Sequence, residues 1–382
     1  MVMNPVRSRG HGIENKIIIN YADRDLLLNG MKENKKETHG NIALYRKYRP
    51  ENWGEVIGQD HIVKAIDGAL KAGKVSHAYL LCGPRGTGKT TIARIIANEL
   101  GSSVNDIYEL DAASNRGIDD VRSIRDSVHT MPFDSKYKIY ILDEVHMFTK
   151  DAWNALLKTI EEPPSHVIFI LATTELEKVP ETIVSRCQSF IFKKPTDAIL
   201  ASVVTNVAKK EGYTLEEGGA ALIALLADGA FRDALGTLQK VISFSVDKKI
   251  SLKDIEEVTG SPNALLVDEF LNAIAHKDIE RGFITIKRVV EENLEMGVYL
   301  KMILSKLRYA LILRYAPKMK SEVESSISEH DMEYITKLVS LKPEHISSST
   351  LSLLLSAYQS LRNSPISELP LEMALVEILN EK

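Results

Sequence analysis

Cysteine is scarce in this 382-residue sequence, which contains only Cys82 and Cys187. Two thiols far apart in the chain cannot build a disulfide framework, and they cannot supply a cysteine-rich zinc site. The composition therefore excludes a disulfide-stabilised secreted domain. We expect no bound zinc, and the low cysteine count fits the reducing cytoplasm.

Long hydrophobic runs are also missing. The longest apolar segment, residues 298–315, is interrupted by four basic residues, Lys301, Lys306, Arg308 and Arg314. It predicts a packing helix and not a membrane span. Near the start of the chain, the three isoleucines at 17–19 are too few for the hydrophobic part of a secretion signal. We expect no membrane association.

No long basic run is present, and the sequence contains 48 basic and 52 acidic side chains. This balance does not exclude DNA binding, because local patches matter more than total charge when a protein holds phosphates. The length is sufficient for two or three domains with a sizeable core.

The segment 83–90, Gly-Pro-Arg-Gly-Thr-Gly-Lys-Thr, satisfies the pattern of a phosphate-binding loop. The apolar residues 78–82 before it predict a strand, and isoleucines at helical spacing after it predict a helix that ends near Gly101. Glycines let backbone N–H groups turn toward a phosphate, and a helix N-terminus attracts the same anion. The sequence therefore predicts nucleotide binding here.

Two residues of this loop have predicted chemical roles. Lys89 is expected to reach the outer phosphates, and the Thr90 hydroxyl to bind Mg²⁺, which prefers oxygen ligands. The residues expected to hold the nucleotide in this segment are Gly83, Pro84, Arg85, Gly86, Thr87, Gly88, Lys89, Thr90 and Thr91.

A second motif, residues 138–144, has the Walker B pattern of a buried strand that ends in two acids. Asp143 is expected in the Mg²⁺ shell, and Glu144 is expected to orient the attacking water or accept its proton. Two acids at a strand end also fit simple solvation, but the phosphate-binding loop upstream favours the catalytic interpretation.

Further along the chain, residues 167–172 predict another buried strand that ends at Thr173 and Thr174. These hydroxyls fit either a sensor of the terminal phosphate or plain strand termination. Arg186 follows a helical segment that begins at Pro180. An arginine there is either a solvated charge or a group that reaches a neighbour's nucleotide.

Seven motifs together resemble the clamp-loader ATPases of the AAA+ class, and among these the gamma/tau subunits of bacterial DNA polymerase III. They occur, in order, at 44–50, 56–59, 83–90, 111–117 (Asp-Ala-Ala-Ser-Asn-Arg-Gly), 143–147 (Asp-Glu-Val-His-Met), 156–164 (ending Glu-Glu-Pro-Pro) and 185–188 (Ser-Arg-Cys-Gln). The resemblance runs from about residue 41 to the end and is strongest through residue 195.

The resemblance implies roles for several residues. Arg186 matches the arginine finger that completes the neighbouring subunit's site, Thr173 or Thr174 matches sensor 1, and Arg232 matches sensor 2. The segment expected around adenine contributes Tyr45, Arg49, Pro50, Val56 and Ile57. Tyr45 fits ordinary packing equally well.

The candidates for DNA contact are Arg116, Arg122, Arg125 and Lys158. Arg122 and Lys158 match family positions that face DNA. For each of the four, a solvated helix charge or a salt bridge between subunits remains an equal alternative.

The predicted fold class is α/β followed by all-α. We expect an N-terminal extension over 1–40, an AAA+ nucleotide-binding domain with a parallel sheet over 41–195, a lid of three or four helices over 196–259, and a helical collar for oligomerisation over 260–382. Residues 100–105 replace the four-cysteine zinc module of many gamma/tau subunits, and the tau-type extension is expected to be missing.

The implied function is an ATPase, with ATP and Mg²⁺, that loads a sliding clamp onto primer-template DNA as part of a DNA polymerase holoenzyme. The implied partners are delta, delta prime and further gamma/tau subunits, the clamp and DNA. Alternatives are an archaeal-type small subunit, a non-hydrolysing scaffold subunit resembling delta prime, and an AAA+ junction-migration helicase. The intact Lys89, Thr90, Asp143 and Glu144 disfavour the scaffold.

Overall fold

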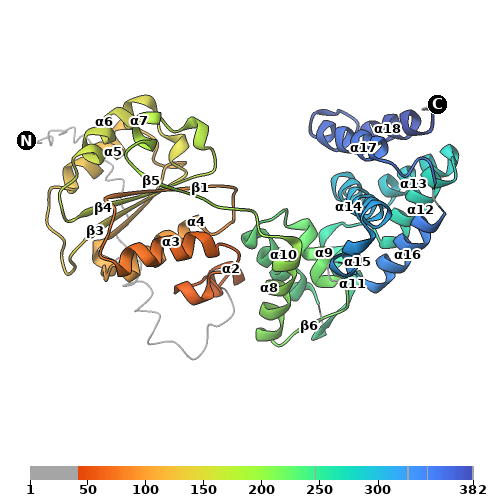
Figure 1. Cartoon of the computed structure of the whole chain (residues 1–382), viewed down its shortest axis with the longest axis horizontal. Coiled ribbons are helices and arrows are strands. Elements are labelled where there is room, and N and C mark those ends of the chain that lie inside the picture. The colour runs from red at the N-terminus through yellow and green to blue at the C-terminus, as the bar shows by residue number, and fades with distance from the viewer. Residues whose placement is uncertain (1–41, 246, 325–326, 342, 381–382) are drawn as a thin grey trace, which may run out of the picture.

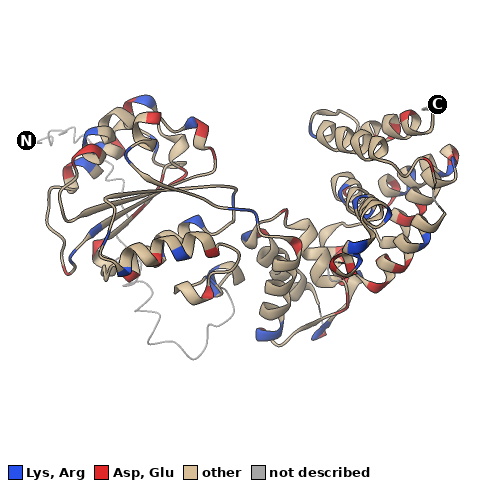
Figure 2. Cartoon of the chain, in the orientation of Figure 1, with Lys and Arg blue, Asp and Glu red and all other residues tan. Residues whose placement is uncertain are grey.

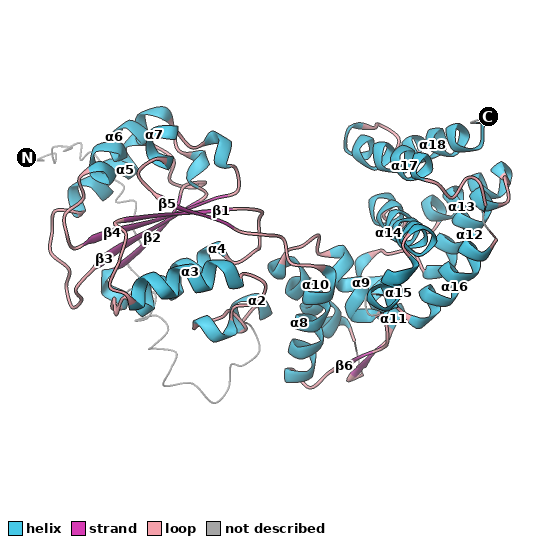
Figure 3. Ribbon diagram, in the orientation of Figure 1, coloured by secondary structure: helices cyan, strands magenta, loops and turns pink. Residues whose placement is uncertain are grey.

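The computed structural model describes residues 42–245, 247–324, 327–341 and 343–380. The expected N-terminal extension, residues 1–40, lies outside the described residues. Figure 1 shows three parts in a row: a sheet covered by helices, a small group of helices beside it, and a larger group that extends to the C-terminus. Figure 3 shows that strands are concentrated in the first part and helices dominate the other two.

The first part contains a five-stranded parallel sheet in the order β2-β3-β4-β1-β5. Its strands are β1 Ala78–Cys82, β2 Ile107–Asp111, β3 Lys138–Asp143, β4 Val167–Thr173 and β5 Gln188–Ile191. The parallel sheet of the expected α/β class is confirmed. The sequence did not predict β2, because this edge strand mixes polar with apolar residues, and Glu109 pairs with Arg94 at 2.7 Å.

Both faces of this sheet are buried, which explains the nearly continuous apolar runs of its central strands. Side chains alternate, so Tyr79 and Leu81 pack on one face while Leu80 and Cys82 pack on the other. Helices α3 (Asp60–Lys71) and α4 (Lys89–Glu99) cover the first face. The second face is covered by α5 Ile118–Ser127, α6 Lys150–Glu161 and α7 Glu181–Val184.

The second part contains four helices and a small two-stranded sheet. Its helices are α8 Asp197–Lys210, α9 Gly219–Leu226, α10 Phe231–Phe244 and α11 Leu252–Thr259. Strands β6 (Thr214–Leu215) and β7 (Lys249–Ile250) pair in parallel. The expectation of helix alone after residue 195 was wrong at these strands, because two-residue strands carry no readable periodicity.

The C-terminal part is all helical. It contains α12 Ala264–Ala275, α13 Ile279–Glu291, α14 Met296–Tyr315, α15 Lys320–Glu324, α16 Glu329–Ser340, α17 Ser348–Ser360 and α18 Leu369–Asn380. In the described part of the chain, no helix is both long enough and apolar enough to cross a membrane. One buried apolar cluster includes residues from α8 to α14 and from α16 to α18. The second and third parts therefore share a core.

The remaining helices are short. They are α2 Leu44–Lys47 and the 3₁₀ turns η1 Trp53–Glu55, η2 Val104–Asp106, η3 Val145–Met147, η4 Leu176–Lys178, η5 Pro317–Met319 and η6 Leu361–Asn363. Helix α2 packs on the lid: Leu44 is buried in the lid cluster, and its N–H donates to Gln239 Oε1 on α10 at 3.0 Å. The start of the expected nucleotide-binding domain thus lies against another part of the fold.

Within the C-terminal part, α14 carries a buried cation. Lys306 Nζ lies 2.5 Å from Asp268 Oδ1 and 2.6 Å from Asp331 Oδ1, and the Lys306 side chain is 8% exposed. Burial raises the pKa of Asp268, while the Lys306 charge opposes that rise. The ammonium group therefore compensates two carboxylates at the junction of α12, α14 and α16.

Substitution Lys306→Met should destabilise this part of the fold by about 3 kcal/mol, because removing one partner of a buried ion pair leaves an uncompensated charge. Urea unfolding followed by circular dichroism measures the change. The matched control is Lys287→Met, which removes an exposed helical ion pair with Glu291 and should cost less than about 0.5 kcal/mol. Equal effects would show that the buried triad contributes no more than a surface pair.

Candidate nucleotide-binding site

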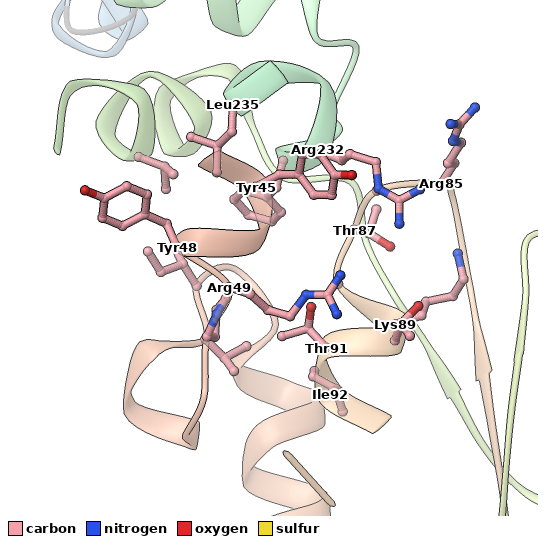
Figure 4. A pocket seen from close by; sticks show the side chains of 18 of the residues that line it. Tyr45, Tyr48, Arg49, Arg85, Thr87, Lys89, Thr91, Ile92, Arg232 and Leu235 are labelled. Atoms are coloured by element: carbon pink, nitrogen blue, oxygen red, sulfur yellow. The ribbon is translucent and has the colours of Figure 1, made fainter. Parts of the chain in front are cut away.

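A cavity of about 290 Å³ lies between the carboxyl edge of the sheet and the lid. The phosphate-binding loop, the segment 45–57 and helix α10 line it. Figure 4 shows Tyr45 and Tyr48 on one side of this cavity and Arg85 and Lys89 on the other. The arrangement places an aromatic wall opposite a phosphate-binding wall.

The phosphate-binding loop connects β1 to α4 as predicted, and its three glycines, Gly83 included, adopt positive φ angles that side chains disfavour. Gly86 has φ +74° and Gly88 has φ +103°. A Cβ atom at Gly86 would lie 2.8 Å from Ala230 Cβ of the lid. The Gly86 carbonyl also accepts a hydrogen bond from Phe231 N at 3.0 Å. Glycine is therefore required here both by conformation and by the close approach of the lid.

Lys89 is the buried cation of the loop, with 6% exposure. Its Nζ donates to the carbonyls of Gly83 at 2.8 Å and Pro84 at 2.9 Å. Burial lowers the pKa of Lys89, and the nearby carboxylates of Glu144 and Asp143 partly offset this. Gly83 and Pro84 thus contribute through their carbonyls and do not line the cavity themselves.

Thr90 and Asp143 meet at the mouth of the loop. Thr90 Oγ1 donates to Asp143 Oδ2 at 2.6 Å, although the residues are far apart in sequence. A hydroxyl and a carboxylate side by side are the oxygen donors that Mg²⁺ prefers, and this ion takes few ligands from protein in phosphate sites. The pair fits the predicted magnesium site. No cluster of three or more histidine, cysteine or acidic side chains suited to a metal occurs within the described residues.

Glu144 follows Asp143 in a left-handed backbone conformation, with φ +50°. The residue lines the cavity, and its Oε2 accepts a hydrogen bond from Thr174 Oγ1 at 3.1 Å. Neither Thr173 nor Thr174 belongs to the cavity lining, and Thr173 is fully buried. Of the two sensor candidates, Thr174 is therefore the one in contact with the Walker B glutamate.

The residues predicted around adenine all line the cavity: Tyr45, Arg49, Pro50, Val56 and Ile57. In Figure 4 the guanidinium groups of Arg49 and Arg232 both extend toward the phosphate-binding loop. Sequence reasoning missed other lining residues, namely Tyr48, Glu55, Ile92, Asp111, Val203, Phe231 and Leu235. Tyr48 and Asp111 lay within the motifs at 44–50 and 111–117, but nothing in the sequence pointed Val203 of α8 toward this site.

Arg232 reaches the cavity from α10. Its guanidinium carbon lies 5.7 Å from the centroid of the Tyr45 ring, within the range of a cation–π contact. Its positive charge also contributes to the lowered pKa of Lys89. Tyr45 therefore connects the adenine side to the lid arginine, in addition to packing against the lid cluster.

Arg186 lies outside this cavity. It donates through Nη2 to Glu161 Oε1 on α6, and through Nη1 to the Thr182 carbonyl at 2.7 Å. A third of its side chain is exposed. The structure therefore holds Arg186 in an ion pair within its own chain.

The four DNA candidates are all exposed, on or beside the packed helices α5 and α6. Arg122 pairs with Asp119 at 3.0 Å and Arg125 with Asp126 at 2.9 Å. Arg116 and Lys158 complete the set. Figure 2 shows basic and acidic side chains intermixed over these helices, so this surface is not uniformly basic.

Sequence similarity to known proteins identifies the family of this chain. The DNA polymerase III subunit gamma of Buchnera aphidicola subsp. Schizaphis graminum is 33% identical over 88% of this chain and 98% of its own length. The chain belongs to the DNA polymerase III gamma/tau family. The DNA polymerase III subunit tau of Bacillus subtilis is 40% identical over 74% of this chain and 54% of the relative. The chain thus spans about half the length of several gamma/tau relatives.

A family model described as DNA polymerase III, delta subunit, matches residues 101–196 of this gamma/tau family member. Among solved structures, the Thermotoga maritima RuvB Holliday junction branch migration motor is 25% identical, with TM-score 0.48 over 59% of this chain and 79% of that one. The Bacillus subtilis DNA clamp loader delta protein is 17% identical, with TM-score 0.33 over 83% and 99%. The fold class rests on the strand order of the sheet and not on these partial structural similarities.

Substitution Gly86→Ala should lower ATP affinity about tenfold or more, because a left-handed alanine costs about 1–2 kcal/mol and its methyl group would displace the lid. Titration with a fluorescent ATP analogue measures the affinity. The matched control is Gly236→Ala in α10, where an added Cβ meets nothing within 4 Å. This control should bind normally, and an equal loss in both variants would exclude the close lid approach as the cause.

Proposed function

We propose that this chain is the ATP-hydrolysing motor subunit of a DNA polymerase III clamp loader, which loads a sliding clamp onto primer-template DNA. The observation that supports this most is the set of hydrolytic groups around one cavity, Lys89, Thr90, Asp143 and Glu144, in a member of the gamma/tau family. A replication subunit of this kind acts in the cytoplasm.

The proposed reaction is attack of water on the γ-phosphate of ATP, which gives ADP and phosphate. Glu144 orients the water and accepts its proton. Lys89 exchanges the carbonyls of Gly83 and Pro84 for phosphate oxygens. When bound by Thr90 and Asp143, Mg²⁺ neutralises charge on the phosphates.

Sensing of the terminal phosphate is assigned to two elements. Thr174 contacts Glu144 directly, so a phosphate that attracts the Thr174 hydroxyl also changes the surroundings of the glutamate. Arg232 approaches from the lid. The N–H of the preceding residue, Phe231, donates a hydrogen bond to the Gly86 carbonyl of the loop. ATP binding would therefore draw the lid toward the sheet.

Arg186 is assigned as the arginine finger for the adjacent subunit. Its ion pair with Glu161 is partly exposed, at 33% and 42% of the two side chains, and exposed pairs contribute at most about 1 kcal/mol. A neighbour's γ-phosphate carries more charge than one carboxylate, so the exchange of Glu161 for that phosphate is favourable. Arg186 thus remains paired with Glu161 until a second subunit binds.

Assembly with delta, delta prime and further gamma/tau subunits is assigned to the C-terminal helices. Exposed apolar side chains there include Ile284 at 52%, Leu355 at 47% and Met373 at 63%. Primer-template DNA is assigned to the surface of α5 and α6, where Arg116 and Lys158 supplement the paired Arg122 and Arg125. To bind DNA, Arg122 and Arg125 must break their ion pairs with Asp119 and Asp126 and contact phosphates instead.

The clamp is assigned to a turn before β3, at the edge of the sheet opposite the nucleotide. Met131 and Phe133 are 73% and 81% exposed. The backbone at Phe133 is fixed nevertheless, because the buried Asp106 carboxylate accepts hydrogen bonds from the N–H groups of residues 133–135 at 2.5 to 2.9 Å. A rigid turn that presents two large apolar side chains suits an apolar pocket on a protein partner.

Substitution Lys89→Ala should abolish ATP binding, because the outer phosphates lose their cation. Arg186→Ala should leave ATP binding near normal and reduce hydrolysis by about 10³-fold in the assembled complex. Nucleotide titration and a phosphate-release assay with clamp and primed DNA measure the two quantities. Equal loss of nucleotide affinity in both variants would contradict the assignment of Arg186 to the neighbour's site. Absence of hydrolysis in the unmodified complex would favour the scaffold role.

The double substitution Met131→Ser with Phe133→Ser should weaken clamp binding by about tenfold or more, because buried apolar anchors dominate protein interfaces. Surface plasmon resonance with immobilised clamp measures the affinity, and ATP binding should be unchanged. Phe244→Ser removes another exposed apolar side chain at the end of α10 and serves as the control. Normal clamp binding by the double variant would contradict the assignment of the clamp contact to this turn.

A further inference from the structure

His146, in the Asp-Glu-Val-His-Met motif, has no part in the chemistry described so far. It lies in η3, directly after Glu144 and Val145. Its side chain is only 8% exposed, unlike most histidines near a protein surface. A buried imidazole next to a catalytic carboxylate requires partners for both ring nitrogens.

Both ring nitrogens have such partners. Nδ1 lies 3.1 Å from Thr173 Oγ1 and 3.4 Å from Glu144 Oε2. On the other side of the ring, Nε2 lies 3.2 Å from Glu175 Oε1. The imidazole therefore stands between two carboxylates and contacts the end of β4.

Glu175 is a firm anchor for this ring. Its carboxylate pairs with Lys178 at 2.8 Å, and the hydrogen bond from Lys178 lowers the pKa of Glu175. Its backbone N–H donates to Thr173 Oγ1 at 3.0 Å. Glu175 is therefore a carboxylate anion at neutral pH, and its Oε1 lies 3.2 Å from His146 Nε2.

Glu144 is constrained from two sides by these contacts. Its Oε2 receives the Thr174 hydroxyl at 3.1 Å and faces His146 Nδ1 at 3.4 Å. A glutamate side chain with free rotamers would spend little time in one orientation. With Oε2 hydrogen-bonded to Thr174 and bordered by His146 Nδ1, the carboxylate has a defined direction along the cavity wall.

We infer that His146 is a positioning residue that, anchored by Glu175, fixes the orientation of the Glu144 carboxylate for its action on the attacking water. The inference deepens the proposed function and rests on the proposed role of Glu144. A positioned general base must lie within hydrogen-bond reach of its proton, so loss of orientation lowers the turnover rate while ATP binding by Lys89 and Arg232 continues.

The test measures kcat and KM for ATP in the assembled complex with clamp and primed DNA. His146→Leu keeps similar bulk without nitrogen, and it should lower kcat about tenfold or more with KM for ATP within about twofold. His146→Asn retains an amide near the Nδ1 position and should restore most of this loss. Equal activity of the two variants would overturn the inference, because packing alone would then explain His146.

A second pair of variants leaves the buried ring in place. Glu175→Ala removes the anchor and should lower kcat severalfold, whereas Glu177→Ala removes an exposed carboxylate of the adjacent turn and should leave kcat unchanged. Because Glu175 is partly exposed, this variant tests the inference even where His146→Leu folds poorly. Unchanged kcat in Glu175→Ala would contradict the anchoring role.

A double-mutant cycle with Glu144→Gln separates this inference from the proposed function. If His146 acts through Glu144, His146→Leu causes no further loss in the Glu144→Gln background. Additive losses would overturn the inference. Full hydrolysis by Glu144→Gln alone would instead refute the role of Glu144, and with it the reason to position it. Loss in Glu144→Gln with normal kcat in His146→Leu would refute only the role of His146.

Discussion

The carboxyl end of β4 holds the two halves of the nucleotide site together. The Thr173 carbonyl accepts a hydrogen bond from Gly83 N at the start of the phosphate-binding loop, at 3.1 Å. The hydroxyls of Thr173 and Thr174 contact His146 and Glu144 on the other side. Since β4 lies between β1 and β3 in the sheet, the loop after β1 and the acids after β3 have fixed positions relative to each other.

The lid depends on the same edge of the sheet. Gly86 lets the lid backbone approach the loop, and the hydrogen bond from Phe231 to Gly86 places Arg232 over the cavity. Helix α2 packs against α10 and carries Tyr45 into the same space. Tyr45 therefore belongs to both the cavity wall and the lid packing.

Much of the site was predictable, because its chemistry resides in short motifs with strict spacing. The phosphate-binding loop, the Walker B acids and the segment that includes Val56 and Ile57 line one cavity, as expected. Other features were not predictable. Val203 and Leu235 belong to helices whose apolar residues also fit a purely structural core, and β2 is an edge strand of mixed composition. Two-residue strands such as β6 are too short for any periodic signal.

The sequence by itself determined the elements that require particular residues: glycines where the loop turns back on itself, Lys89 and Thr90 at the helix start after that loop, and apolar runs where strands are buried on both faces. Only the tertiary structure decided which distant groups meet. It paired Thr90 with Asp143, placed His146 between Glu144 and Glu175, and tied Arg186 to Glu161. Motifs specify local conformation and chemical type, but the contacts between them depend on strand order and on packing across the whole sheet.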